Sequence, residues 1–435
     1  MGRLMPIFVI VLVDLLGLTI IVPLMPLYAA SFGANAFVIG LLGAAYPIMQ
    51  IVGAPALGRL SDRYGRKPVL VASQIGTFAG FILMGLANAL PLLFVARIID
   101  GLSGANLSTA QAVITDNTNE KTRTSALALI GAAFGIGFII GPVIAFASLG
   151  LSNNNYQAPA FVAAGFSLLS LLLTAFWLKE SLPAERRGKA HKENAFSLNR
   201  FAAALKHPVV GFLLLLMFAQ QFVFGGMEQL LSLFTLDRLG LDARGNSIIF
   251  LFIGLIALVM LGYVIRVWSR KFGDRWIIYV GLIMLAIGML MTALTPAMPP
   301  PWYSQASLLS ELQRSATQQV NVIIPPDGNT GWLGIVWLMV AMIPAAVGGS
   351  VLSPTINSAI TKRIDPSEVG GILGISAAMV SAANALAPVV LGAMFQVLGP
   401  ASPFLLGGIV LLVLLFFATR QLKESAAAQP VAQAG

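Results

Sequence analysis

The chain has 435 residues, of which 57% are hydrophobic and only 10% are charged. A soluble protein carries roughly 25% charged residues, so this chain lacks the polar side chains that would cover it in water. Its net charge of +9 does not indicate nucleic acid, because the basic residues lie in short loops between apolar runs. The sequence has no cysteine and therefore no disulfide framework. The composition predicts an integral membrane protein with the lipid bilayer as its solvent.

Apolar runs of about 20 residues predict twelve membrane-spanning helices. They are expected near 5–29, 36–58, 69–89, 91–115, 124–147, 156–178, 208–235, 247–266, 276–296, 331–360, 367–397 and 402–420. The uncharged stretches 124–178 and 369–419 are too long for one span, and turn-forming residues at 152–155 and 399–403 divide them. The first run, from about Met5, has no small-residue cleavage site and is expected to be a retained helix.

Basic residues indicate on which side of the membrane each loop lies. If both termini are cytoplasmic, all but four of the 26 Lys and Arg residues fall on the cytoplasmic side. The exceptions are Arg97 inside a predicted span and Arg238, Arg244 and Arg314 in outer loops. An odd number of helices would destroy this asymmetry. We therefore expect a multi-pass protein of the cell membrane, in bacteria the inner membrane, with both termini cytoplasmic.

A long polar stretch divides the predicted spans six and six. We expect 1–178 to form an N-terminal six-helix bundle, 179–207 a solvated cytoplasmic linker, 208–421 a C-terminal six-helix bundle and 422–435 a flexible tail. Two such halves around a midplane cavity are typical of secondary transporters built from repeats. The outer loop 297–330 is long and rich in Pro, Ser and Gln, and no role for it follows from the sequence.

A charged decapeptide separates the second and third spans: Gly58 to Lys67 reads Gly-Arg-Leu-Ser-Asp-Arg-Tyr-Gly-Arg-Lys. Its spacing, G-x-x-x-D-x-x-G-R-K, resembles the loop 2–3 signature of the major facilitator superfamily. The resemblance to that family covers nearly the whole chain, and within the family the N-terminal half is most similar to the twelve-helix drug–proton antiporters, tetracycline exporters included. The resemblance implies an all-α membrane fold of two six-helix pseudo-repeats. The expected residues of a cytoplasmic latch are Gly58, Asp62, Arg63, Gly65, Arg66, Lys67 and Asp116.

The latch has a mechanical interpretation. Asp62 is expected against the start of helix 11, near Ser367, because unpaired N–H groups at a helix N-terminus attract a carboxylate. Arg66 is expected to hold the end of helix 4 at Asp116. The alternative, charges that only set topology, explains the Arg and Lys residues but not the Asp and the glycines. The second half has a decayed copy around Gly273 that lacks an acid opposite Asp62.

Charged side chains inside predicted spans are costly in lipid and are functional candidates. The proton-coupling candidates are Asp14, Arg97, Asp100 and Glu228. Both histidines lie in the linker, so only carboxylates are expected to carry protons within the membrane. Asp14 lies near the middle of helix 1, where changing hydration would make it bind and release a proton. The alternative is a structural Asp that caps backbone or pairs with a cation.

Arg97 and Asp100 share one face of helix 4. Arg97 followed by Gly101 resembles the R-x-x-x-G signature of the family, whose Arg is implicated in proton coupling, whereas Asp100 is this sequence's own. Arg97 would exchange between Asp100 and Asp14, or it would simply neutralise Asp100.

The remaining candidates concern helix packing and the substrate. Gly137, Gly141 and Pro142 resemble the helix 5 antiporter signature of exporters, although small residues four apart also occur in ordinary helix packing. The expected substrate-binding residues are Gln220, Gln221, Phe224, Glu228, Asn357 and Asn384. Glu228 belongs either to a pocket wall or to the membrane interface, depending on its depth.

The chain has no nucleotide-binding G-x-x-x-x-G-K-[ST] sequence and no His or Cys metal cluster. We therefore expect no enzyme, no catalytic residue, no cofactor and no metal, and a proton gradient as the energy source. The expected protein is a monomeric proton-coupled antiporter that exports an amphipathic or lipophilic small molecule by alternating access. Tetracycline is not the expected substrate, because 276–296 lacks the acid of tetracycline exporters. A proton-coupled uptake symporter or lipid translocase, and a non-transporting membrane receptor, remain alternatives.

Overall fold

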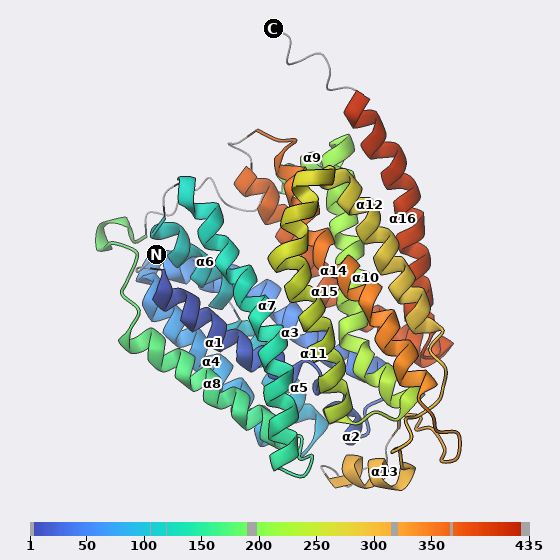
Figure 1. Cartoon of the computed structure of the whole chain (residues 1–435). Coiled ribbons are helices and arrows are strands. Elements are labelled where there is room, and N and C mark those ends of the chain that lie inside the picture. The colour runs from blue at the N-terminus through green and yellow to red at the C-terminus, as the bar shows by residue number, and fades with distance from the viewer. Residues whose placement is uncertain are drawn as a thin grey trace.

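The computed structural model describes residues 4–104, 106–118, 120–188, 198–314, 321–365 and 369–427. Helices and turns make up this part of the chain, with no strand among these residues, which confirms the predicted all-α class. The helices (Figure 1) are α1 (Met5–Ile21), α2 (Met25–Ser31), α3 (Ala36–Tyr64), α4 (Arg66–Gly85), α5 (Leu90–Ser103), α6 (Asn106–Asp116), α7 (Glu120–Leu151), α8 (Gln157–Phe176), η1 (Ala184–Arg186), α9 (Leu198–Lys206), α10 (Pro208–Leu239), α11 (Ala243–Val259), η3 (Met260–Val264), α12 (Ile265–Ala293), α13 (Gln305–Arg314), α14 (Leu333–Thr361), α15 (Val369–Leu398) and α16 (Ser402–Ala427).

Ten helices of the described residues are long and apolar enough to cross a membrane, and the bent pair α1–α2 adds an eleventh. The pair bends by 43° where Pro23 and Pro26 remove backbone donors. One of the ten is the run Ala243–Ala293, which has 51 residues. One crossing needs about 20 residues, so this run is long enough for two crossings. It breaks at Gly273, whose φ of 75° and ψ of 165° are not helical. The described helices are thus consistent with the twelve predicted spans.

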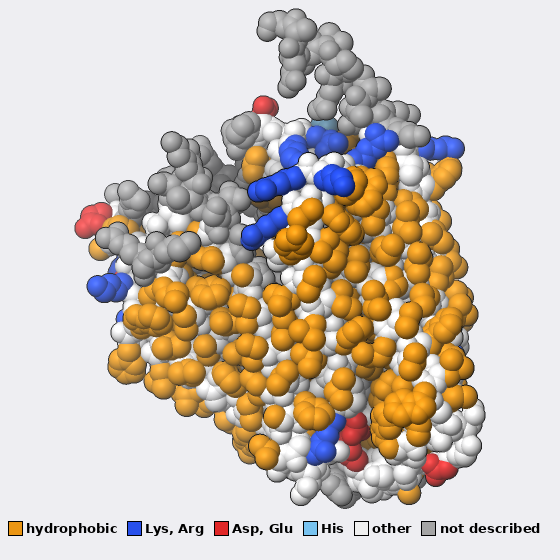
Figure 2. All heavy atoms as spheres, viewed as in Figure 1, with side chains coloured by type: hydrophobic (Ala, Val, Ile, Leu, Met, Phe, Trp, Pro, Cys, Tyr) orange, Lys and Arg blue, Asp and Glu red, His pale blue; other side chains and the backbone are white. Residues whose placement is uncertain are grey.

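The surface of the molecule fits a bilayer. Hydrophobic side chains cover the middle of the face shown in Figure 2, and Lys and Arg gather at the end where α9 lies. We call this the basic end, and the opposite end, where α13 lies (Figure 1), the α13 end. An apolar band between polar ends is what a membrane-spanning helix bundle requires.

The helices pack as two groups. Within the first, α1 packs against α7 and α8, and α4 against α5 and α8; within the second, α12 packs against α14 and α16, and α10 against α14 and α15. We call α1–α8 the N-terminal group and α10–α16 the C-terminal group. The two meet mainly along α3 with α15 and along α7 with α11. The predicted domain boundaries after residues 178, 207 and 421 stay a prediction.

The two groups touch closely along α3 and α15 toward the α13 end. A Cβ added to Gly40 of α3 would lie 2.1 Å from the Pro388 carbonyl oxygen of α15, and Ala36 N donates to Gln396 Oε1 at 3.1 Å. Nearer the basic end of the same two helices, a Cβ at Gly58, Gly371 or Gly374 would meet no atom within 4 Å. The groups are therefore closed at the α13 end and apart at these positions near the basic end.

Candidate functional site

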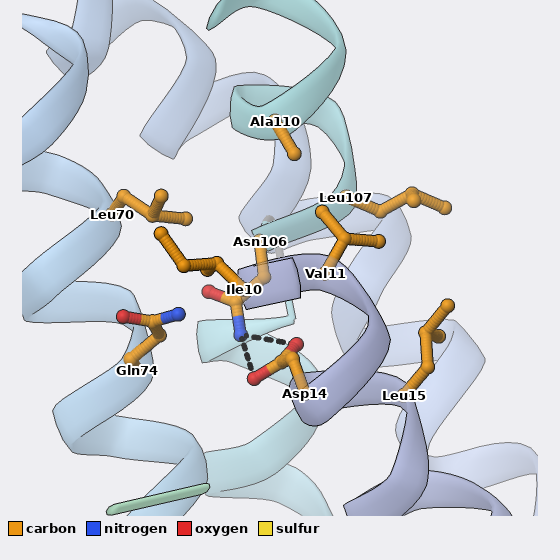
Figure 3. Close-up of a pocket in the computed structure, with 9 residues that line it drawn as sticks. All are labelled: Ile10, Val11, Asp14, Leu15, Leu70, Gln74, Asn106, Leu107 and Ala110. Atoms are coloured by element: carbon orange, nitrogen blue, oxygen red, sulfur yellow. Dashed lines mark hydrogen bonds between the residues drawn. The ribbon is translucent and has the colours of Figure 1, made fainter. Parts of the chain in front are cut away.

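Asp14 and Asn106 are joined inside the N-terminal group. Asp14 lies in α1 and is partly buried, while Asn106 is the first residue of α6. Asn106 Nδ2 donates to both carboxylate oxygens of Asp14, at 3.2 and 3.0 Å (Figure 3). Helix α5 ends at Ser103 and α6 begins at Asn106, so a break in the predicted fourth span brings Asn106 to this place. Asp14 thus has an amide donor as its partner.

A pocket of about 280 Å³, open space at its mouth included, lies beside Asp14. Its polar lining is Asp14, Gln74 and Asn106, from α1, α4 and α6, and its remaining lining is apolar (Figure 3). Gln74 Nε2 donates to Ser170 Oγ at 2.7 Å, and Gln74 Oε1 has no partner within the described residues. The described residues contain no group of three or more His, Cys, Asp or Glu side chains that would hold a metal ion.

A chain of polar side chains continues from Asp14 to the second acid. Asn106 Nδ2 also lies 3.4 Å from Thr77 Oγ1, and the Thr77 hydroxyl hydrogen-bonds with Asp100. Asp100 in turn forms an ion pair with Arg97 at 3.4 Å, with both side chains almost fully buried. The resulting order is Asp14, Asn106, Thr77, Asp100 and Arg97, drawn from four helices.

Arg97 has a further aromatic neighbour. Its guanidinium carbon lies 4.9 Å from the centroid of the Tyr46 ring, a distance at which a cation is attracted to the ring face. Gln50 Nε2 donates to the Tyr46 hydroxyl at 3.3 Å and to the Gly104 carbonyl at 2.9 Å. Arg97 Nε is buried without a partner in the described part of the chain. The Arg97 guanidinium is thus held between the Asp100 carboxylate and the Tyr46 ring, and its Nε–H donor is unused within the described residues.

The structure therefore brings three of the four proton-coupling candidates together. Arg97 pairs with Asp100, as one of the two alternatives has it, and Asp14 is bonded by Asn106 and not by Arg97. Asn106 and Thr77 were not predicted as site residues. Both are polar residues in predicted spans, which is the only sequence signal that would have found them.

Glu228, the fourth candidate, lies apart in the C-terminal group. It is partly buried in α10 and accepts no hydrogen bond from any residue that the structure describes. Near it, Gln221 Nε2 donates to Asn384 Oδ1 of α15 at 2.9 Å, which joins two of the predicted substrate-binding residues. Phe224 instead packs against Gly349 of α14.

The other two substrate-binding candidates do not join this contact. Gln220 is buried at 1% exposure, and its Oε1 has no partner among the described residues. Asn357 Oδ1 accepts a hydrogen bond from Ser376 Oγ at 2.8 Å, between α14 and α15. The predicted substrate set is therefore divided over separate contacts, and its role stays a prediction.

The glycines of the predicted antiporter signature face α1. A Cβ at Gly141 would lie 2.3 Å from Thr19 Oγ1, and one at Gly137 would lie 3.4 Å from Thr19 Cγ2. Pro142 lies inside α7 directly after Gly141. Small residues here let α7 approach the helix that carries Asp14, and a part in antiport stays a prediction.

At the basic end, Arg66 holds the contact that the sequence predicts. Its Nε lies 3.1 Å from Asp116 Oδ2, and its Nη1 lies 2.6 Å from Asp62 Oδ1. The Asp62 side chain is 46% exposed, and Ser367, its expected neighbour in helix 11, lies outside the described residues. The contact of Asp62 with the C-terminal group stays a prediction.

The first part of the linker docks on this loop. Glu180 accepts hydrogen bonds from Arg66 N at 3.0 Å and Lys67 N at 3.1 Å, and Gly188 N donates to the Asp62 carbonyl at 3.0 Å. A carboxylate at this place satisfies donors that the first turn of α4 leaves free. This start of the linker is therefore not simply solvated, while 189–197 lie outside the described residues.

The second half carries its acid directly after the glycine. Asp274 directly follows Gly273, as Arg66 follows Gly65, and both glycines have a positive φ. Asp274 Oδ2 accepts from Lys362 Nζ at 2.6 Å and from Ser358 Oγ at 3.0 Å. Opposite Asp62 the second half has Arg270, and its acid stands on the other side of the glycine.

Comparison with known proteins identifies the family. Residues 7–320 match the family model described as Major Facilitator Superfamily. Tetracycline resistance protein, class B, of Escherichia coli is 30% identical over 283 residues, which are 63% of this chain and 68% of that protein. Multidrug resistance protein 2 of Bacillus subtilis (strain 168) is 29% identical over 289 residues, 65% of this chain and 71% of that protein.

Solved structures agree on the fold. The nucleoside transporter NupG aligns with a TM-score of 0.71 at 13% identity, over 97% of this chain and 100% of that chain. The human organic anion transporter MFSD10 (TETRAN) aligns with a TM-score of 0.59 at 21% identity, over 96% of this chain and 98% of that chain. The chain belongs to the Major Facilitator Superfamily, and it is a multi-pass membrane transporter of small molecules and not an enzyme.

Proposed function

We propose that the protein is a proton-coupled antiporter that exports an amphipathic or lipophilic small molecule by alternating access. The observation that carries this proposal is the polar chain from Asp14 through Asn106 and Thr77 to the Asp100–Arg97 pair. Relatives named for tetracycline and multidrug resistance support export as the direction of transport.

The charges of Asp14, Asp100 and Arg97 explain why a proton would exchange for a substrate. With both acids ionised, Asp14 and Asp100 carry two negative charges against the one positive charge of Arg97. The spare negative charge is costly in a dry, apolar environment. One proton on Asp14 removes it, and a cationic substrate nearby would offset it equally well. Proton and substrate then compete for the same spare charge, which is the requirement for antiport.

Alternating access is supported by the contacts between the two groups. They are tight at Gly40 toward the α13 end and open at Gly58 and Gly371 toward the basic end. The Arg66–Asp116 contact of the latch is formed within the N-terminal group, while 46% of the Asp62 side chain is exposed, as we expect if Asp62 meets the C-terminal group only in the opposite state. Because the basic end is cytoplasmic by the distribution of Lys and Arg, we assign this conformation to a state open to the cytoplasm, in a bacterial inner membrane.

Everted membrane vesicles test the proposal. Energised vesicles that contain the protein accumulate protons inside, which a fluorescent pH probe reports. Adding the lipophilic cation ethidium is expected to release protons from the lumen of these vesicles and not from vesicles without the protein. Proton movement in the same direction as the substrate would indicate a symporter, and binding without any proton or substrate flux would indicate a receptor; either result contradicts the proposal.

A further inference from the structure

The start of α12, at the basic end, carries an excess of positive charge. Residues 260–279 contain four cations and one acid. The cations are Arg266, Arg270, Lys271 and Arg275. The acid, Asp274, is turned toward α14, where Lys362 binds it, and its side chain is only 11% exposed. Arg275 is half-buried and donates from Nε to the Tyr279 hydroxyl at 2.9 Å. The charge that this segment shows to its surroundings is therefore positive.

The other three cations have no acid to neutralise them. Arg266, Arg270 and Lys271 are exposed, and none of them forms an ion pair with an acid of the described residues. Arg66, in the corresponding loop of the N-terminal group, is instead held by Asp116 at 3.1 Å. Exposed cations without an acid are available to an anion from outside the chain.

A cluster of three aromatic rings stands beside these cations. Phe272 stacks on Trp276 with the ring centroids 4.3 Å apart, and Trp268 meets Trp276 edge to face at 5.4 Å. Lys271 Nζ lies 5.2 Å from the centroid of the Phe272 ring. Tryptophan is enriched where a membrane protein crosses the headgroup region, because its ring is apolar and its N–H is polar. The rings therefore indicate that the cations lie at headgroup depth.

The aromatic cluster stands at the head of an apolar stripe. Trp276, Ile283 and Ile287 are spaced i, i+7 and i+11 along α12, which places them on one face of the helix. Their side chains are 37%, 37% and 40% exposed, and apolar side chains exposed along a membrane-spanning helix face lipid. Figure 2 shows Lys and Arg directly beside the hydrophobic band at the basic end. A lipid along this stripe would have its headgroup among the cations.

We propose that Arg266, Arg270 and Lys271 bind the phosphate of an anionic phospholipid whose acyl chains lie along the Trp276–Ile287 face of α12. A zwitterionic lipid carries its own cation, which offsets the attraction of its phosphate to these side chains. A small soluble anion would meet the cations but would gain nothing from the rings or the stripe. The cations and the apolar face together therefore select an anionic lipid. This site does not depend on the direction of transport or on Asp14.

Quenching of tryptophan fluorescence by brominated lipid tests the site. The full-length protein is placed in phosphatidylcholine bilayers that contain a minor share of phosphatidylglycerol with brominated acyl chains. We expect more quenching than that share alone would give, and the excess should disappear in Trp276→Phe, which keeps a ring at this place. Brominated phosphatidylcholine at the same share should give no excess. High salt should reduce the excess, because it screens the cations from the phosphate.

Paired substitutions separate the site from net charge. Arg270→Gln with Lys271→Gln should weaken the preference for phosphatidylglycerol over phosphatidylcholine about 30-fold, which is about 5-fold for each cation removed. Arg59→Gln with Lys206→Gln is the matched control, because it removes two exposed cations outside α12 and should leave the preference unchanged. Arg270→Lys with Lys271→Arg keeps both charges and should keep the preference, which distinguishes loss of charge from a disturbed fold.

Four results would overturn the proposal. Excess quenching that survives Arg270→Gln with Lys271→Gln would show that these cations hold no lipid. An equal loss in the control pair would reduce the effect to the net charge of the protein. Equal quenching by the two brominated lipids would leave a lipid-facing stripe without a headgroup site. Inorganic phosphate that abolishes the excess at constant ionic strength would assign the cations to a free anion.

Discussion

Lys362 Nζ lies 2.6 Å from Asp274 Oδ2 and ties the end of α14 to α12. In the N-terminal group, Arg66 and Asp116 make the corresponding contact, with the cation on the loop and the acid at the end of α6. The second group has the same arrangement with the charges exchanged. What the two groups share is therefore an ion pair after a glycine of positive φ, and not a particular residue type at each position.

This reversal predicts the outcome of a charge swap. Asp274→Lys places two cations together and should lower the transport rate about 5-fold, since an ion pair of this exposure is worth up to about 1 kcal/mol. The double variant Asp274→Lys with Lys362→Asp should recover the rate. Transport is measured in vesicles at equal protein content. A double variant as slow as the single one would show that the pair has no part in holding α12 to α14.

Gly40 controls how closely the groups meet at the α13 end. A Cβ there would lie 2.1 Å from the Pro388 carbonyl oxygen, and backbone cannot move aside as a flexible side chain does. Gly40→Ala should shift the protein toward the state open at the α13 end. The chain has no cysteine, so spin labels on Leu151→Cys and Leu294→Cys, both exposed, measure this shift as the population of the longer distance between α7 and the end of α12. Gly165→Ala, where no atom lies within 4 Å, is the matched control and should leave the population unchanged.

Asn106 is predicted to support the ionised form of Asp14. Asn106→Leu removes both donated hydrogen bonds, and a hydrogen bond to a charged group is worth about 1.5–3 kcal/mol. Proton-driven transport should therefore fall by about 10–100-fold, while substrate exchange without a proton gradient continues. Gln74→Leu alters the same pocket without touching the partner of Asp14. Equal losses in the two variants would mean that the pocket, and not the Asn106 contact, matters.

Glu180 is predicted to stabilise the start of α4. Glu180→Ala leaves the N–H groups of Arg66 and Lys67 without their acceptor, and loss of a helix cap costs about 1 kcal/mol. For a protein of this size, the melting temperature should fall by about 1–3 °C, measured by thermal unfolding in detergent. Glu185→Gln, an exposed acid five residues on, should not change it.

The spans and the buried charges follow from the sequence because hydropathy is a local property. Twelve apolar runs, and acids at positions 14 and 100 within them, are visible without knowing how helices pack. The helix breaks are less visible. Proline explains the bend after α1, whereas the breaks at Gly104 and Gly273 depend on how neighbouring helices pack.

Side-chain partners between helices were the least predictable feature. Asn106 meets Asp14 across 92 residues of chain, and that pairing depends on how α1 and α6 are rotated against each other. Glu311 is a stronger case. An acid in a polar outer loop is expected in water, and only the approach of the α7–α8 connection buries it.

Substitution of Asp14 tests the central claim most directly, because that claim makes its carboxyl the group that exchanges protons. Purified Asp14→Asn protein in liposomes should still exchange labelled for unlabelled substrate across the membrane. It should fail to accumulate that substrate in response to a pH gradient, whereas Asp365→Asn, which alters an exposed acid, should accumulate it as the wild type does. Accumulation by Asp14→Asn at the wild-type rate would contradict the account.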